Sequence, residues 1–263
     1  MKLFKKLGLM LLMLAMVAQA QQSVGELFQA AKKGDAAAFA ELKALGNKGD
    51  ASAQFNLGLM YDTGDGVPKD SVEAVSWYRK SAEQGNATAQ SNLGAMYANG
   101  NGVPKDSVEA VSWFRKSAEQ GNAKAQYNLG LMYDNGEGVP KDAVQAVSWY
   151  RKSAEQGNAE AQSNLGWMYS NGEGVPKDAV QAVAWHRKSA DQGNASGQTN
   201  LGAMYSRGEG VPKDLVVSYM WRNLAAAQGN EIAKRAREAL GKIMTSAQIA
   251  EAQRLSYEWE PKP

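Results

Sequence analysis

The stretch GNAKAQYNLGLMYDNGEGVPKDAVQAVSWYRKSAEQ, residues 121–156, decides the fold because close copies of it fill most of the chain. These copies recur every 36 residues and begin at Gly49, Gly85, Gly121, Gly157 and Gly193. A fixed period of this length is typical of solenoid proteins, in which each unit buries its apolar face only against its neighbours. The sequence therefore predicts five stacked repeats over residues 49–228.

The first half of the third repeat has the spacing of an amphipathic helix. Leu129, Met132 and Tyr133 fall on one helical face, and Asn122 precedes them as a suitable N-cap. Gly130 lies inside this helix and recurs in every repeat, although glycine there costs about 1 kcal/mol relative to alanine. We therefore expect another backbone to pack closely against Gly130.

The second half of the repeat predicts a turn and then a second helix. Asn135 and Gly136 can end the first helix, because glycine readily takes the left-handed conformation. Asp142 is a suitable N-cap for the next helix, with Gln145 completing a capping-box pattern. A tryptophan recurs in this helix of every repeat, which predicts a column of buried indoles: Trp77, Trp113, Trp149, Trp185 and Trp221.

The segments on either side of the repeats are interpreted as caps, which a solenoid needs at its ends. Residues 21–48 predict an N-terminal capping helix pair, over 25–33 and 36–45. Residues 229–263 predict C-terminal capping helices and a tail. Within this segment Thr245 and Gln248 form a capping-box pattern at the start of the last helix.

Residues 1–20 are interpreted as a signal peptide. Lys2, Lys5 and Lys6 precede an apolar run over 7–17, and Ala-Gln-Ala at 18–20 is a suitable cleavage site. Because the run is too short to span a membrane comfortably, a permanent anchor is the less favoured alternative. The protein is therefore expected to be periplasmic or secreted, and to meet the membrane only through this transient segment.

Charge and composition exclude several classes of function. Without the signal peptide the chain has 26 basic and 27 acidic residues and no basic stripe with aromatics, which argues against nucleic acid as a partner. Cysteine is absent, so disulfides and thiolate chemistry are excluded. The single histidine, His186, stands where other repeats have Tyr78, Phe114 and Tyr150, and is interpreted as a packing residue. We predict no catalytic residue, no metal site and no cofactor.

The motif A-x-A-Q-x-N-L-G-x-M-Y, followed by G-x-G-V-P-K-D and A-V-x-W-Y/F-R-K-S-A, resembles the Sel-one-like repeat (SLR), a relative of the tetratricopeptide repeat. The resemblance covers residues 49–228. It implies an all-α fold, a right-handed α-solenoid of helix-turn-helix repeats in which the first helix of each pair lines the concave side. It also implies an adaptor role in protein complexes, often in the cell envelope or at host contacts for exported bacterial members.

Four positions of the first helix change between otherwise similar repeats, and we expect them to form one stripe opposite the Leu/Met face. Drift on a solvent-exposed surface would explain the variation, but would normally leave polar residues. Exposed aromatic residues mark interaction sites instead. The stripe is therefore a candidate protein-binding surface, with the residues Phe55, Leu59, Tyr127, Leu131, Trp167, Lys124, Asp134 and Glu160.

Among the possible functions, the sequence favours a scaffold that binds an envelope or host protein or peptide. The alternative is a cell-wall glycan-binding module, in which Tyr127 and Trp167 stack on sugar rings. Hydrolysis of β-lactams, associated with cysteine-rich members of the family, ranks third. It is disfavoured because the paired cysteines and a Ser-x-x-Lys motif are missing from this sequence.

Overall fold

The computed structural model describes residues 23–261, and helices are the only regular secondary structure over that range. It contains fourteen helices and no strand among these residues, which confirms the all-α prediction. None of the helices in this part of the chain is long and apolar enough to cross a membrane. The proposed signal peptide lies outside the described residues.

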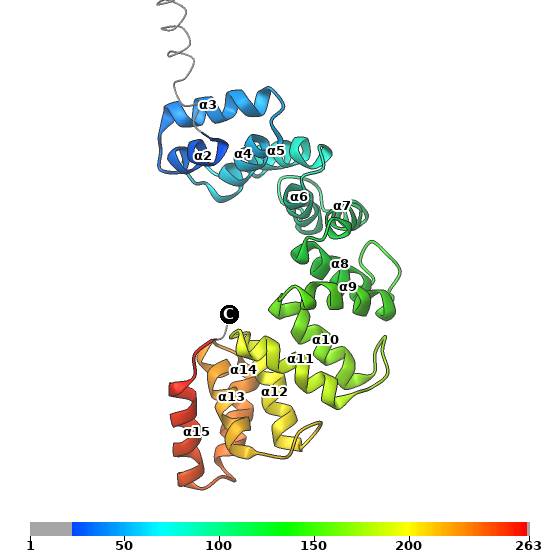
Figure 1. Ribbon diagram of the computed structural model, residues 1–263, viewed down its shortest axis with the longest axis vertical. Coiled ribbons are helices and arrows are strands. Elements are labelled where there is room, and N and C mark those ends of the chain that lie inside the picture. Colours follow the sequence, from blue (N-terminus) through cyan, green and yellow to red (C-terminus); the bar gives the residue numbers. More distant parts are fainter. Residues whose placement is uncertain (1–22, 262–263) are drawn as a thin grey trace, which may run out of the picture. The chain divides into compact units, whose positions relative to one another are not determined.

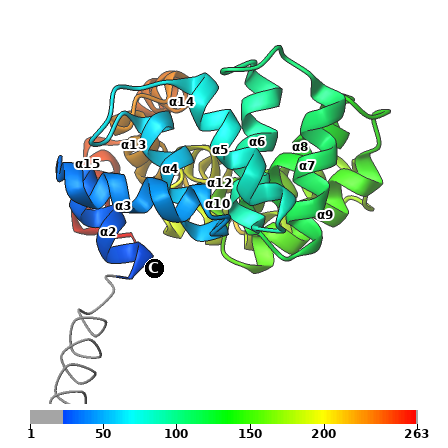
Figure 2. The ribbon, with the colours of Figure 1, turned by 90° about the horizontal axis from the view of Figure 1, so that it is seen from above.

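The helices follow one another in pairs, and the loop within each pair of the repeats stands out from the helices as an extended segment (Figures 1 and 2). Before the repeats come α2 (Val24–Lys32) and α3 (Ala36–Asn47). The repeats contribute α4 (Ala51–Thr63), α5 (Ser71–Glu83), α6 (Ala87–Asn99), α7 (Ser107–Glu119), α8 (Ala123–Asn135), α9 (Ala143–Glu155), α10 (Ala159–Asn171), α11 (Ala179–Asp191), α12 (Ala195–Arg207) and α13 (Leu215–Ala227). The last two helices are α14 (Glu231–Gly241) and α15 (Ser246–Glu258).

The described chain divides into two compact units. Unit 1 comprises residues 23–96 and Gly100–Pro104, and unit 2 comprises Tyr97–Asn99 and residues 105–261. The residues of α6 are therefore shared between the units, whereas α2 to α5 belong to unit 1 and α7 to α15 belong to unit 2. The handedness expected for the solenoid stays a prediction.

Local capping sets the helix ends, largely as predicted. Asn122 accepts a hydrogen bond from the N–H of Ala125 at 2.9 Å. Gly136 ends α8 in the left-handed conformation, with a φ of 74°. Asp142 accepts bonds at 3.0 Å from the backbone N–H groups at the start of α9. The predicted capping box of α15 is also present, with Thr245 as its N-cap. Each of these caps depends on a few adjacent residues, and the helix ends could therefore be predicted from the sequence.

In the first, third and fourth repeats the glycine inside the first helix faces a ring of the second helix, which corrects the expected backbone contact. In the fifth repeat Gly202 faces the side chain of Arg222 and the backbone carbonyl of Ser218. A Cβ on Gly130 would lie 2.6 Å from Cδ1 of Tyr150, on the second helix of the same repeat. A Cβ on Gly166 would lie 2.7 Å from Nδ1 of His186. Glycine is therefore needed at these positions because atoms of the partner helix, in most cases a ring, occupy the space of a side chain.

Buried glutamines join each repeat to the one before it. In unit 2, Gln126 Nε2 donates to the carbonyl of Ala118 in the preceding repeat at 3.0 Å. Within the third repeat, the exposed Gln156 donates through Nε2 to Gln126 Oε1 at 2.7 Å. Ser153 Oγ donates to the carbonyl of Ala123 at 2.7 Å and links the two helices of one repeat. Equivalent bonds recur in the following repeats. Each of these bonds lies within one repeat or joins two adjacent repeats, as expected for a stacked repeat array.

The tryptophan column is less buried than predicted. Three of its indoles are nearly inaccessible, but Trp149 and Trp185 are half-buried. A lysine ammonium covers the outer face of the ring in the first four repeats, and Lys152 Nζ lies 4.0 Å from the ring centroid of Trp149. These indoles therefore combine apolar packing with a cation–π contact at the protein surface.

The last helix covers the apolar end of unit 2, where α15 lies against α13 (Figure 1). Ser256 Oγ donates to the carbonyl of Met220 at 3.3 Å. The rings of Trp221 and Trp259 meet edge to face, with centroids 6.0 Å apart. Tyr219 and Met220 are buried there, at positions where earlier repeats have valine and serine or alanine. The last repeat thus carries larger apolar residues that fit its covering helix.

Candidate functional site

The eight residues predicted from the sequence are distributed over both units. Phe55 and Leu59 lie on α4 of unit 1. The other six lie in unit 2, on α8 (Lys124, Tyr127, Leu131 and Asp134) and on α10 (Glu160 and Trp167). Three side chains are exposed, those of Lys124, Glu160 and Trp167, and the remaining five are half-buried.

The stripe flanks the core instead of lying opposite to it, which corrects the expected orientation. The ring centroid of Phe55 lies 6.0 Å from that of Tyr78, and Tyr127 lies at the same distance from Tyr150. Both contacts join the two helices of one repeat. Small polar residues at the same position of other repeats are buried: Ser91, Ser163 and Thr199. Phe55 and Tyr127 therefore contribute to packing and expose only part of their rings.

A hydrogen bond continues this packing toward the end of the hairpin. Tyr150 Oη donates to Asp134 Oδ2 at 3.2 Å, and Tyr78 Oη donates to Asp62 at 3.4 Å in the first repeat. Burial raises the pKa of Tyr150, and the charge of Asp134 raises it further. The phenol therefore stays protonated and can keep donating, and Asp134 is tied to the hairpin instead of projecting freely toward a partner.

Both positions of this pair vary among the five repeats. Tyrosine occurs with aspartate in the first and third repeats, and phenylalanine with alanine in the second. The fourth repeat has His186 with Ser170. The fifth has Arg222 with Ser206, and Arg222 Nη2 donates to Ser206 Oγ at 3.2 Å. Internal comparison of the repeats could have drawn attention to this pair, because both positions vary and tyrosine occurs only together with aspartate.

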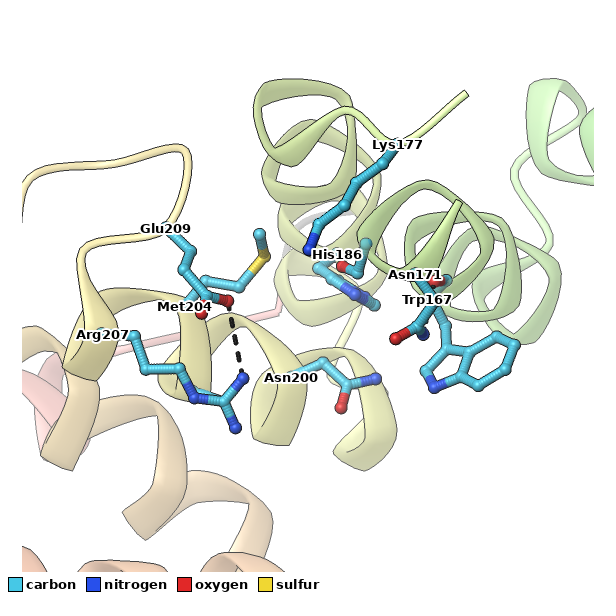
Figure 3. Close-up of a pocket in the computed structure, with 10 residues that line it drawn as sticks. Trp167, Asn171, Lys177, His186, Asn200, Met204, Arg207 and Glu209 are labelled. Atoms are coloured by element: carbon cyan, nitrogen blue, oxygen red, sulfur yellow. Dashed lines mark hydrogen bonds and ion pairs between the residues drawn. The ribbon is translucent and has the colours of Figure 1, made fainter. Parts of the chain in front are cut away.

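In the fourth repeat the short pair borders a cavity of about 350 Å³ between α10, α11 and α12 (Figure 3). Imidazole and a serine hydroxyl fill less space here than the tyrosine and aspartate of the first and third repeats. The cavity lies wholly within unit 2. Its lining is mainly polar and consists of Trp167, Ser170, Asn171, Lys177, His186, Asn200, Ala203, Met204, Arg207 and Glu209.

The inner wall of the cavity is formed by a neutral histidine. His186 is 2 % exposed, as expected for a packing residue. Its Nδ1 is buried against Gly166 and has no hydrogen-bond partner. Burial lowers the pKa of His186 to about 4. At neutral pH the imidazole is therefore uncharged, and the charge of the cavity comes from its other side chains.

Two cations and one carboxylate line the outer part. Arg207 Nη1 lies 3.5 Å from Glu209 Oε2, and both side chains are largely exposed. Lys177 extends from the loop before α11 toward the cavity (Figure 3). The lining thus has a surplus of one positive charge. No group of three or more His, Asp or Glu side chains suited to a metal ion occurs within residues 23–261.

Trp167 stands at the rim of the same cavity and is 43 % exposed (Figure 3). Its backbone carbonyl accepts a hydrogen bond from Asn171 Nδ2 at 2.9 Å, within the last turn of α10. The equivalent residues in the adjacent repeats are Leu131 and Ala203, both half-buried. The sequence prediction therefore identified this exposed indole correctly, but missed the polar cavity beside it.

Stacked helical pairs joined by neighbour-to-neighbour contacts define an α-solenoid repeat protein. The Sel1 repeat model matches residues 51–86, 87–122, 123–158, 159–194 and 195–230, and the chain belongs to the Sel1 repeat family. These boundaries lie two residues later than the blocks defined by self-similarity. Sel1 repeat proteins generally serve as protein-interaction scaffolds, and the fold is that of a non-catalytic family. No curated protein sequence matches the chain.

Two solved structures share more than a third of their aligned residues with this chain. A Sel1 repeat protein from Oxalobacter formigenes is 35% identical, with a TM-score of 0.77 over 89% of this chain and 96% of its own. A protective antigen with an SLR fold from uropathogenic Escherichia coli is 37% identical, with a TM-score of 0.71 over 90% of this chain. The match spans only 56% of that antigen's chain. An immunity protein from Pseudomonas aeruginosa, at 20% identity and a TM-score of 0.50 over 81% of this chain and 84% of its own, shares the fold alone.

Proposed function

We propose that this Sel1 repeat protein is an exported bacterial scaffold that binds a protein or peptide through the first helices of its repeats, with Trp167 as the anchor. The exposed indole of Trp167 is the observation that carries the proposal. This large aromatic residue is 43 % exposed and therefore keeps apolar surface in contact with water. Aromatic residues of this kind dominate the binding energy of protein interfaces. The scaffold role of the family supports the same class of partner.

Charged residues accompany this anchor on α8 and α10. Lys124 and Glu160 are both exposed. Glu160 lies close enough to Tyr127 to raise the pKa of that phenol, in addition to the larger effect of burial. The surface therefore combines the exposed part of the Tyr127 ring with charges of both signs. Such a surface suits a peptide with polar and apolar side chains better than a uniformly charged partner.

Site-specific photo-cross-linking tests the proposal directly. A benzophenone amino acid replaces Trp167 in one variant and Val144, which is 64 % exposed on α9, in a matched control. We expect the variant at 167 to cross-link one defined envelope or host protein in vivo, and the control not to. Trp167→Ala should then weaken binding of the purified partner at least tenfold, about 1.4 kcal/mol. Cross-linking from 144 alone, or unchanged affinity in Trp167→Ala, would contradict the proposal.

The same exposed indole supports one alternative, a cell-wall glycan ligand, because aromatic faces also stack on sugar rings. Co-sedimentation with purified peptidoglycan separates the two functions. A glycan-binding module would sediment with peptidoglycan, and Trp167→Ala would stay in solution. The favoured scaffold function predicts that neither form sediments above the level of an unrelated periplasmic protein.

Export is tested by the N-terminus of the protein recovered from its own cells. The signal-peptide interpretation predicts a chain that begins at Gln21 in the periplasmic fraction or in the medium. A cytoplasmic chain that retains residues 1–20 would contradict this part of the proposal without affecting the binding surface.

A further inference from the structure

The cavity of the fourth repeat differs from the equivalent place in the first and third repeats. There the Tyr–Asp pair closes the end of the hairpin with a hydrogen bond, as Tyr150 and Asp134 show. In the fourth repeat the equivalent residues are His186 and Ser170, and both line an open cavity of about 350 Å³. This place therefore has room for a group supplied from outside the chain.

The chemistry of the lining is suited to an anion of low charge. Lys177 and Arg207 supply two cations, of which Arg207 is partly compensated by Glu209 at 3.5 Å. His186 is buried and contributes no charge. Asn171, Asn200 and Ser170 add side chains that can donate hydrogen bonds. A surplus of one positive charge balances one carboxylate, whereas a phosphate dianion would face Glu209 with a charge left uncompensated.

We propose that the cavity between α10, α11 and α12 binds a carboxylate, with Lys177 and Arg207 as the cationic contacts and the indole of Trp167 beside its entrance. The inference deepens the proposed function, because an acidic side chain or C-terminus of a bound peptide would bring the carboxylate next to the Trp167 anchor. A free small carboxylate would present the same chemistry.

His186 is the only histidine in the chain, so its imidazole reports on this cavity alone. The purified chain without residues 1–20, labelled with ¹⁵N at histidine, is titrated with N-acetyl-aspartate N-methylamide. The asparagine analogue, which differs only in having a neutral amide, is the matched probe. We expect a saturable shift of the His186 resonance with the aspartate probe and at least a tenfold weaker response to the asparagine probe. An equal response to both, or no saturable shift with either, would overturn the proposal.

Two variants test the assignment of residues. Lys177→Gln should weaken binding of the aspartate probe at least tenfold, whereas Lys141→Gln, the equivalent lysine of the third repeat, should leave it unchanged. The double variant Ser170→Asp/His186→Tyr installs the pair that the first and third repeats already contain, and should abolish binding in calorimetry while the fold is kept. Equal effects of Lys177→Gln and Lys141→Gln, or full binding in the double variant, would show that the cavity is not the carboxylate-binding site.

The source of the carboxylate is resolved by comparing the aspartate probe with a partner peptide found by cross-linking. Binding of that peptide at least tenfold tighter than the probe, with loss of this advantage in Lys177→Gln, assigns the carboxylate to the peptide. Equal affinities assign the cavity to a free small carboxylate. If no partner cross-links at 167 while the probe still binds, only the proposed function fails. If a partner is captured with unchanged affinity by Lys177→Gln and the double variant, only the cavity proposal fails.

Discussion

The phenol of Tyr150 and the carboxylate of Asp134 hold the two helices of the third repeat together through a hydrogen bond of 3.2 Å. The two residues are separated by 16 positions, the same separation that joins Tyr78 to Asp62 and Arg222 to Ser206. The same two positions of a repeat therefore join its two helices through a Tyr–Asp bond in some repeats and an Arg–Ser bond in another. The second repeat replaces the pair by Phe114 and Ala98, without polar groups.

A double-mutant cycle measures the coupling of this pair. Tyr150→Phe should lower the free energy of unfolding by about 1 kcal/mol, because Asp134 loses a donor. Asp134→Ala in the Tyr150→Phe background should then cost little, since it reproduces the pair of the second repeat. We expect a coupling energy of about 0.5–1.5 kcal/mol from urea unfolding of the four proteins. Strictly additive effects would show that the bond does not contribute to stability.

Protonation of His186 should destabilise the fold at acid pH. Burial lowers its pKa from 6.5 to about 4, so between these pH values the unfolded chain binds the proton more tightly than the folded chain. Stability is therefore lost as the pH falls from about 6.5 to 4, by at most about 3 kcal/mol for this group.

The variant His186→Phe isolates this effect, because phenylalanine occupies the same position in the second repeat and does not titrate. The difference in unfolding free energy between the variant and the natural chain should move in favour of the variant by about 3 kcal/mol or less between pH 7 and pH 4. The carboxylates titrate in both proteins and cancel in the comparison. An identical difference at the two pH values would contradict a buried neutral imidazole.

Glycine is needed at two positions of the repeat for different reasons, at one for its backbone conformation alone and at the other also for lack of space. Gly138 and Gly121 both have positive φ, of 70° and 92°. A Cβ on Gly138 would lie 2.1 Å from the carbonyl oxygen of Ser107, whereas a Cβ on Gly121 would meet nothing within 4 Å. Gly121→Ala should therefore cost about 1 kcal/mol, from the left-handed backbone alone. Gly138→Ala should cost at least twice as much in urea unfolding, and similar costs would show that the loop moves away freely.

Trp167 and Tyr127 should respond differently to truncation. Trp167→Ala should lower the free energy of unfolding by about 1 kcal/mol or less, because 43 % of the residue is already exposed. Tyr127→Ala should cost about 1–3 kcal/mol, because its ring packs against Tyr150. Calorimetric unfolding of both variants checks this order. A larger loss in Trp167→Ala would assign the indole to the core and weaken its proposed role as a binding anchor.

The sequence predicted features that depend on a few adjacent residues. The N-cap at Asn122, the left-handed Gly136 and the capping box at Thr245 all act within one helical turn, and the structure contains each of them. The number and type of repeats were likewise predictable, because the same 36-residue pattern recurs five times and the family model finds all five.

The orientation of the candidate stripe could not be predicted in the same way. A variable position on a helix is exposed only if no other helix covers it, and this depends on how the hairpin closes. Ser163 varies between repeats and is nevertheless buried, whereas Trp167 on the same helix is exposed. The cavity beside Trp167 depends on the sizes of His186 and Ser170 together, which becomes visible only when the two helices are placed side by side.

The glutamine contacts between repeats also bear on how such a chain changes its length. In unit 2, the donors Gln126, Gln162 and Gln198 each reach an alanine carbonyl at the end of the previous hairpin. Because donor and acceptor are of the same type at these three junctions, excision or insertion of 36 residues between them restores the same bonds where the chain is rejoined. Recombination between equivalent codons can therefore shorten or extend the array without leaving a buried amide unsatisfied.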